Sequence, residues 1–434
     1  MKKRRNKAMV LVTVLWVAVI LTILVASTGR THRVDTKISV YTAQQRRCAW
    51  AARAGIETAL AVLGQDDPSS DSLDELWSDN DEDYNDVSVG GCTLTIRVID
   101  EASKLNINTA TKDQLMGLPE MTSDIADAIL DWRDRNDQPR EEGVEAGYYE
   151  QLSIPYTIRN GPFRTVRELL LVKGVEEEED LFYGEDTNFN NQLDENERDG
   201  DESLPLDNGD SELDRGWIAY LTCYSYEHNR DGSGQERVNI NEASQEDLES
   251  ELGLQPGHAK WIVDNRDDEY DSIGDLINNR SPKRASQQSG DSDEAQALDL
   301  ETYKSIVDKI TVSEDDRLLG RVNLNTASHE VLAALFGGED EGRETAESVK
   351  TYREGLMFGM SSVGSLLNVS GVNVSTFKDV VDHVTVRSPV YAIRCVAQAN
   401  QTAVSGATGH YQAVVDRSET PPMFLYRYQG AGTQ

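Results

Sequence analysis

The sequence is poor in cysteine, histidine and basic residues, and each shortage excludes a class of function. The histidines form no HExxH motif and no GxSxG motif is present, so no signature of a metalloprotease or a serine hydrolase appears. Lys plus Arg total 42 against 77 Asp plus Glu, for a formal net charge of -35. Such a surface repels nucleic acid and anionic lipid at long range. We expect a protein without catalytic activity, whose favoured partners are cations or basic protein surfaces. The cysteines lack a CxxC pair, which excludes a zinc ribbon and a thioredoxin-type site; they are Cys48, Cys92, Cys223 and Cys395.

The first thirty residues predict a membrane anchor. A cluster of basic residues precedes an apolar run from Ala8 to about Ala26, and about twenty such residues in a helix span the roughly 30 Å hydrocarbon core. The basic cluster marks the cytoplasmic side, which places the chain after Arg30 outside the cytoplasm. A cleaved secretory signal is the alternative, but the run is long for one and no A-x-A site closes it.

The helical pattern continues beyond this run. More than thirty further residues contain no proline, and Gly64 ends the segment. Apolar residues recur at steps of three, four or seven, which predicts one apolar stripe on a continuous helix of more than fifty residues. The stripe consists of Val34, Ile38, Tyr41, Cys48, Ala52, Ile56, Leu60 and Leu63.

A helix that is half apolar and half amphipathic resembles the stem of type IV pilins and type II secretion pseudopilins. The resemblance implies a short basic leader that a prepilin peptidase removes, and the matching bond here joins Ala8 to Met9. Most subunits of these filaments carry glutamate at the fifth mature position, where this chain has Thr13. The K subunit of type II secretion lacks that glutamate, and "MVLVTVLW" resembles the opening of its stem.

Alternating segments predict a small sheet at both ends of the remaining chain. "VSVGGCTLTIRVID" places Cys92, Leu94, Ile96 and Val98 on one face, and similar runs return after residue 387. We therefore predict an α+β fold, with a long N-terminal transmembrane and amphipathic helix, a pseudopilin-type antiparallel sheet and a large inserted α-helical domain. The predicted ranges are a leader (1–8), a stem helix (9–64), first head strands (65–103), an inserted, mainly helical domain (104–379) and closing strands (380–434).

The predicted insert contains three copies of one motif, near 104–176, 237–280 and 321–373. Each copy opens on an Asn-x-Asn-x-Ala run followed by Thr or Ser, which predicts capped helices. Later echoes, "FRTVREL", "YDSIGDL" and "MSSVGSL", support true repetition. The repeated asparagines and alanines are Asn106, Asn108 and Ala110; Asn239, Asn241 and Ala243; and Asn323, Asn325 and Ala327.

These modules resemble helix-hairpin-helix units of competence DNA receptors, in which hairpin glycines admit a phosphate. The first hairpin instead carries Glu120, Thr122 and Asp124, and the third is acidic throughout. Carboxylates there repel phosphate, so we expect packing units and no nucleic-acid partner. A competence-type DNA receptor stays as the less favoured alternative.

The whole pattern narrows the resemblance to the type II secretion minor pseudopilin K family, whose large helical insert contains such modules. Membership implies a non-enzymatic subunit at the tip of a periplasmic pseudopilus that supports protein export across the outer membrane. The implied partners are other minor pseudopilins, the prepilin peptidase and inner-membrane lipid. A minor pilin of a type IV pilus is the nearer alternative, because stem and processing would be shared.

The segment "DTNFNNQLDENE" predicts a calcium loop, since it places oxygen side chains at EF-hand spacing. Position six carries Asn191 in place of glycine, and a solvated acidic loop is the alternative. Asp207, Asn208, Asp210 and Asp214 are candidates for a further ion, and Cys92 and Cys395 for a disulfide. The predicted calcium ligands are Asp186, Asn188, Asn190, Gln192, Asp194 and Glu197. Calcium binding is also implied by the family resemblance.

Overall fold

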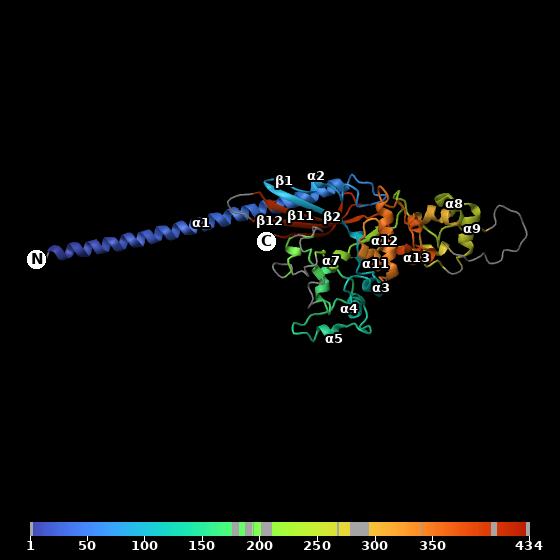
Figure 1. Ribbon diagram of the computed structural model, residues 1–434, viewed down its shortest axis with the longest axis horizontal. Helices are drawn as coiled ribbons and strands as arrows, with labels where there is room; N and C mark the ends of the chain where they lie inside the picture. Colours follow the sequence, from blue (N-terminus) through green and yellow to red (C-terminus); the bar gives the residue numbers. More distant parts are fainter. Residues whose placement is uncertain are drawn as a thin grey trace, which may run out of the picture.

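One long helix projects from a head of mixed helix and sheet (Figure 1). The computed structural model describes residues 3–175, 182–186, 193, 195–200, 211–266, 269–277, 295–338, 340–400 and 406–430. The predicted α+β class is confirmed: a long apolar N-terminal helix joins an antiparallel sheet, and helical modules lie beside that sheet.

The projecting helix is α1, Lys3–Leu63, and it is continuous over 61 residues, as the periodicity predicts. Its large apolar side chains from Met9 to Val25 are exposed, and it is long and apolar enough to cross a membrane. Burial of the helix begins at Gln44. Only the second half of the predicted apolar stripe therefore contacts the head, because Val34 and Ile38 are exposed.

The head contains a five-stranded antiparallel sheet in the order β1-β2-β11-β12-β13. Strand β2 precedes the helical modules in the chain and β11 follows them, yet the two pair directly, with Cys395 opposite Ile96 and Ala399 opposite Cys92. The sheet strands are β1 (Val87–Val89), β2 (Cys92–Asp100), β11 (Val390–Ala399), β12 (Thr408–Asp416) and β13 (Met423–Gly430).

The last turns of α1 cover one face of this sheet. Cys48, Ala52 and Ile56 pack against the alternate inward side chains of β2, Leu94 and Ile96 among them. Two glycines allow the close approach. A Cβ at Gly55 would lie 2.3 Å from the Cys395 Sγ, and a Cβ at Gly409 would lie 2.6 Å from the backbone carbon of Cys48.

Each repeat begins and ends on one short parallel strand pair. We call the repeats modules 1, 2 and 3; each continues past its predicted range to a closing helix and strand. Module 1 contains β3 (Leu105–Asn106), α3 (Lys112–Met116), α4 (Ser123–Arg133), η2 (Val166–Leu171), α7 (Trp217–Tyr220) and β4 (Leu221–Thr222). Module 2 contains β6 (Val238–Asn239), α8 (Gln245–Leu252), α9 (Pro256–Asp264), η4 (Ile273–Ile277), α10 (Leu300–Ile306), η5 (Val307–Lys309) and β7 (Ile310–Thr311). Module 3 contains β9 (Val322–Asn323), α11 (His329–Leu335), α12 (Asp340–Glu354), η6 (Val363–Asn368), α13 (Val374–Val380), η7 (Val381–His383) and β10 (Val384–Thr385).

Shorter elements connect these parts. They are α2 (Asp81–Tyr84), η1 (Glu101–Ser103), α5 (Ala146–Tyr149), η3 (Glu195–Glu197), β5 (Tyr226–His228) and β8 (Arg317–Leu319).

The repeated asparagines act as clasps rather than as helix caps. Thr111, Ser244 and Ser328 cap the first helices, as predicted for Thr and Ser. The second asparagine of each run instead forms two hydrogen bonds to one backbone residue ahead of the module's 3-10 helix. In module 3 the Asn325 amide donates to the Met360 carbonyl at 2.9 Å and accepts from the Met360 N–H at 2.7 Å. Asn108 holds Phe163 and Asn241 holds Tyr270 in the same way.

An arginine near the end of each module's second helix completes the motif. Arg133, Arg266 and Arg353 donate to backbone carbonyls of the Asn-x-Asn-x-Ala run. The bonds from Arg353 to the carbonyls of Leu324 and Ala327 are both 2.7 Å long. Repetition of the sequence therefore follows from repetition of one buried hydrogen-bond network.

Modules 2 and 3 pack reciprocally. The Val363 N–H donates to Asp308 in module 2 at 3.2 Å, and the Ile273 N–H donates to Asp382 in module 3 at 3.4 Å. Each 3-10 helix carries a glycine against the partner's closing helix, and a Cβ at Gly364 would meet Val307 at 3.2 Å. The two modules thus form an internal pseudo-dimer.

Candidate functional site

The predicted processing site and Thr13 lie on the exposed part of α1. Met9 is 74% exposed, and the Thr13 hydroxyl donates to the backbone carbonyls of Met9 and Val10 at 3.1 and 2.9 Å. Thr13 is therefore an uncharged side chain whose hydroxyl is hydrogen-bonded within its own helix. Cleavage between Ala8 and Met9 stays a prediction.

The first hairpin presents acidic groups where a DNA-binding hairpin needs an open glycine loop. Glu120 adopts a left-handed backbone with φ of 54°, and the Thr122 hydroxyl donates to the Asp124 carboxylate at 2.6 Å. This hydrogen bond lowers the pKa of Asp124, which keeps it charged. A phosphate at this hairpin would face the negative charge of Asp124.

Only part of the predicted calcium loop can be placed. Asn188, Asn190, Gln192 and Asp194 lie outside the described residues, as do Asp207, Asn208 and Asp210 of the further stretch. The first and last predicted ligands, Asp186 and Glu197, are 4% and 1% exposed. The two ends of the predicted loop therefore carry buried carboxylates.

A cluster of acidic groups in module 1 forms a second candidate metal centre. Asp131, Asp134 and Glu145 each offer a carboxylate oxygen within 4.8 Å of the others. Asp131 is fully buried and Glu145 is 9% exposed. The chain wraps closely around Asp131, because a Cβ at Gly143 would lie 1.9 Å from its Oδ2 atom.

The electrostatics of this cluster fit a hard cation. Neither carboxylate oxygen of Glu145 has a hydrogen-bond partner among the described residues. Burial, with added repulsion from Asp131 and Asp134, raises the pKa of Glu145 to about 7. Arg140 donates to Asp131 at 2.5 Å and to Asp134 at 2.8 Å, which leaves the cluster with an excess of carboxylates. Oxygen ligands of this kind suit calcium.

The described residues contain another cluster of acidic side chains, and this cluster does not suit a metal ion. Asp66, Asp71 and Glu75 also lie close together. Arg417 already bridges Asp66 and Asp71 at 2.5 and 2.6 Å. The third carboxylate, Glu75, accepts a hydrogen bond from the Trp77 indole N–H at 2.7 Å, so every carboxylate of this cluster already has a partner, in contrast to Glu145.

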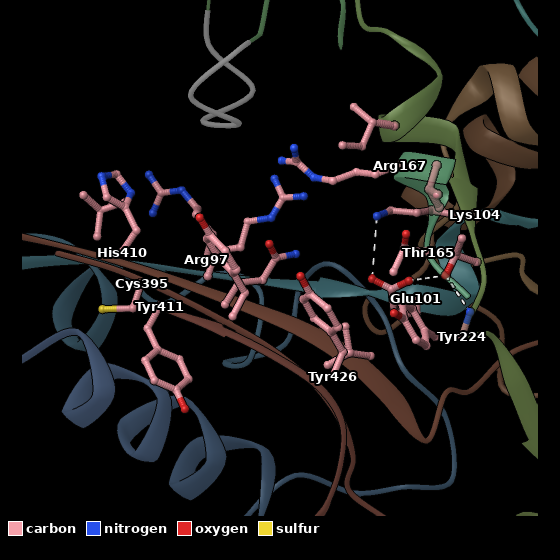
Figure 2. A pocket seen from close by; sticks show the side chains of 18 of the residues that line it. Arg97, Glu101, Lys104, Thr165, Arg167, Tyr224, Cys395, His410, Tyr411 and Tyr426 are labelled. Atoms are coloured by element: carbon pink, nitrogen blue, oxygen red, sulfur yellow. Dashed lines mark hydrogen bonds and ion pairs between the residues drawn. The ribbon is translucent and has the colours of Figure 1, made fainter. Parts of the chain in front are cut away.

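A cavity of about 550 Å³ lies between module 1 and the outer face of the sheet. Figure 2 shows Lys104 and Arg167 entering it from the module side, whereas Tyr426 rises from the sheet. Cys395 and Tyr411 point to the opposite face, toward α1. Glu101 is held by Thr222 and, at 3.7 Å, by Lys104.

Basic and apolar side chains dominate this lining, in contrast to the acidic chain as a whole. Arg97 donates to the Asn85 amide oxygen at 2.7 Å, and Arg167 donates to the Tyr183 hydroxyl at 3.3 Å. Val166 and Ile218 add apolar surface. The arrangement can accommodate an anionic group beside an apolar one.

Module 1 differs from modules 2 and 3 at this cavity. By alignment of the echoes, Arg167 stands where Gly274 and Gly364 allow modules 2 and 3 to pair. Ala219 likewise replaces the pairing aspartates Asp308 and Asp382. Module 1 therefore turns the equivalent surface toward the sheet and not toward another module.

Sequence reasoning missed the acidic cluster and the cavity. Two aspartates three residues apart, followed by a glycine and a glutamate, were the available signal. The cavity is lined by segments more than 200 residues apart, such as those of Arg167 and Arg394, so no local pattern in the sequence predicts it.

Comparison with known proteins finds a similarity in the first part of module 1. Residues 103–179 match the family model described as "Type II secretion system (T2SS), protein K". A search of curated proteins found no match. One similar solved structure is described as the crystal structure of the GspK-GspI-GspJ complex from the enterotoxigenic Escherichia coli type 2 secretion system, with 12% identity and a TM-score of 0.46. The alignment covers 93% of this chain and 100% of that one. Over residues 103–179, the family match supports the prediction of a protein K-type minor pseudopilin of type II secretion.

Proposed function

We propose that this protein K-type minor pseudopilin occupies the tip of the pseudopilus, and that it supports protein export as an assembly subunit without catalytic activity. Its stem would lie in the inner membrane and its head in the periplasm. The basic N-terminus and the exposed apolar part of α1 support this orientation.

The position of the modules is the observation that carries the tip assignment. Figure 1 shows α1 entering the head from one end, with modules 2 and 3 at the end remote from the N-terminus and module 1 beside the sheet. In a filament of parallel stems, the next subunit outward would need that remote space. The modules fill it, so we infer that elongation cannot continue beyond this subunit.

The proposed partners are other minor pseudopilins, which would pack along the stem. Val34, Ile38 and Val40 are exposed between the membrane segment and the head. Exposed apolar side chains on a helix favour contact with other helices. The prepilin peptidase would act first, between Ala8 and Met9, and inner-membrane lipid would surround the stem until assembly.

We further propose that calcium stabilises the head. Asp131, Asp134 and Glu145 fit a cation by their burial and by the unpartnered Glu145 oxygens. The loop ligands predicted from sequence, Asp186 and Glu197 among them, remain candidates for another site. Bound calcium would neutralise the buried carboxylates and hold the loop around Asp131 in place.

Labelling of isolated pseudopili tests the tip position. Gold-labelled antibody against the head should mark one end of each filament. Thr13→Glu restores the carboxylate usual in shaft subunits, yet the modules should still restrict label to the end. Label along the shaft, in either protein, would contradict the steric argument.

N-terminal sequencing of membrane-extracted protein tests the processing. A start at Met9 is expected, because the basic leader stays cytoplasmic while the apolar stem remains in the bilayer. An intact Met1, or a start beyond Ala26, would rule out the proposed maturation.

A further inference from the structure

Two buried cysteines meet where the stem joins the head. The Sγ atoms of Cys48 and Cys92 lie 3.2 Å apart, and both residues are 0% exposed. We propose that Cys48 and Cys92 form a disulfide bond that fastens α1 to the sheet. The inference rests on the proposed function, because it needs a head that folds in an oxidising compartment.

The backbone around the pair is well defined by its contacts. Cys92 is the first residue of β2 and pairs with Val89 across a tight turn. Cys48 lies on the first buried turns of α1, and its thiol donates to the Ala407 carbonyl at 3.4 Å. Bond formation requires the sulfur atoms to approach by about 1.2 Å. A small rotation of two side chains supplies that movement, and the helix stays where Gly409 receives it.

The structure excludes the pairing of Cys92 with Cys395 considered from sequence. Cys395 lies opposite Ile96 and Cys92 opposite Ala399, so four residues of strand separate them. At about 3.4 Å per residue this is roughly 14 Å, whereas bridged cysteines have Cα atoms within about 7 Å. Cys395 instead packs on Gly55, and Cys223 follows β4 in module 1.

The bond would form by thiol–disulfide exchange with a protein disulfide of the periplasm. One cysteine thiolate attacks that disulfide and releases one thiol of the oxidant. The second cysteine then displaces the oxidant as its other thiol. Two protons leave Cys48 and Cys92, two electrons reduce the oxidant, and one Sγ–Sγ bond forms.

This exchange must precede complete packing of the head. In the folded protein both sulfur atoms are inaccessible, and burial raises the pKa of Cys48 to about 12. The folded thiols would therefore react slowly with any protein oxidant. Once formed, the same burial protects the bond from reduction.

The position of the bond has a mechanical consequence. Residues toward the N-terminus from Gln44 are largely exposed, so any pull along the stem reaches the head at this first buried turn. A covalent link across 44 residues also restricts the unfolded chain. With the disulfide, the contact between α1 and the sheet should therefore withstand a larger shear force than noncovalent packing alone.

Mass spectrometry of the full chain, extracted from membranes, tests the proposal. The protein is denatured and alkylated without reduction, then digested. The expected result is a linked pair of peptides containing Cys48 and Cys92, with alkyl groups on Cys223 and Cys395. Alkylation of all four cysteines, or a different linked pair, would overturn the inference.

Matched variants provide a second readout. Reduction under denaturing conditions, followed by refolding with reductant, should lower the melting temperature of the wild type by roughly 5–15 °C. Cys48→Ala, Cys92→Ala and the double variant should melt alike and ignore reductant, because each removes the same bond. Cys223→Ala should keep the response to reductant. Additive single effects would contradict a shared bond.

Protease digestion in spheroplasts tests separately whether the head lies in the periplasm, as the proposed function requires. A digestible head with four free thiols refutes only the disulfide. A head protected from protease refutes the proposed location, whatever the state of the thiols.

Discussion

The clasp formed by Asn325 gives a quantitative test of why the sequence repeats. Asn325 is 3% exposed and Met360 is fully buried. In Asn325→Ala, the Met360 N–H and carbonyl both lose their partner at a place that water does not reach. Each buried backbone group left without a partner costs about 1–3 kcal/mol. We therefore expect the free energy of unfolding of module 3 to fall by about 2–6 kcal/mol.

Asn241→Ala is the matched control. Asn241 makes the same pair of bonds, at 3.0 Å to the Tyr270 carbonyl and 2.9 Å from its N–H. Asn241 is only partly buried, so water can replace part of what is lost. Asn241→Ala should therefore lower the free energy of unfolding by less than Asn325→Ala does. Because the two asparagines make the same bonds, their burial is the main difference between the variants.

Hydrogen exchange and denaturant titration of the full-length protein in micelles measure the effect. The Met360 amide should exchange at least tenfold faster in Asn325→Ala, while the Tyr270 amide changes little. Equal stability of the two variants would refute the clasp argument. So would unchanged stability accompanied by lost affinity for nucleic acid, since the asparagines would then serve a ligand.

Further predictions concern the proposed metal centre and the modules. Millimolar calcium should raise the melting temperature of the wild type, and equal magnesium should raise it much less. Glu145→Gln should reduce the rise caused by calcium, because it removes a ligand of the cluster. Glu197→Gln measures how much of that rise comes from the predicted loop. In chelator, the free energy of unfolding should fall as pH rises from about 4.5 to about 7, because the raised pKa of Glu145 makes the folded protein bind more protons than the unfolded protein in that window. Glu145→Gln should flatten this dependence on pH. The same pH dependence in the wild type and the variant would contradict the assignment to Glu145. Gly364→Arg should destabilise the protein by about 1–3 kcal/mol by separating modules 2 and 3, whereas Gly147→Arg, where a Cβ meets nothing within 4 Å, should not; denaturation midpoints decide.

Local patterns were enough to predict the stem, the terminal strands and the capped helices. Helix periodicity defined α1 because the stripe continues without proline, and alternation defined β2 because its Cys92, Leu94 and Ile96 face one core. Capping by Thr111 and Ser244 followed from short-range chemistry. In each case the deciding contacts lie within a few residues or on one face.

The features that the sequence did not predict depend on contacts between residues far apart in the chain. The clasp between Asn108 and Phe163 spans 55 residues, and nothing in the Asn-x-Asn spacing identifies its partner. The approach of Cys48 to Cys92 depends on how α1 crosses the sheet, which periodicity does not specify. The proposed cation site around Asp131 has no local signal either, because it depends on Gly143 folding back onto Asp131.

Export by a strain that lacks this protein tests the central claim most directly. Secreted proteins should accumulate in the periplasm and disappear from the medium, and the full-length chain should restore their export. Pilus-dependent motility should be unchanged, which separates this role from that of a type IV minor pilin. Normal export in the deletion strain, or loss of motility with export intact, would contradict the assignment to the type II secretion pseudopilus.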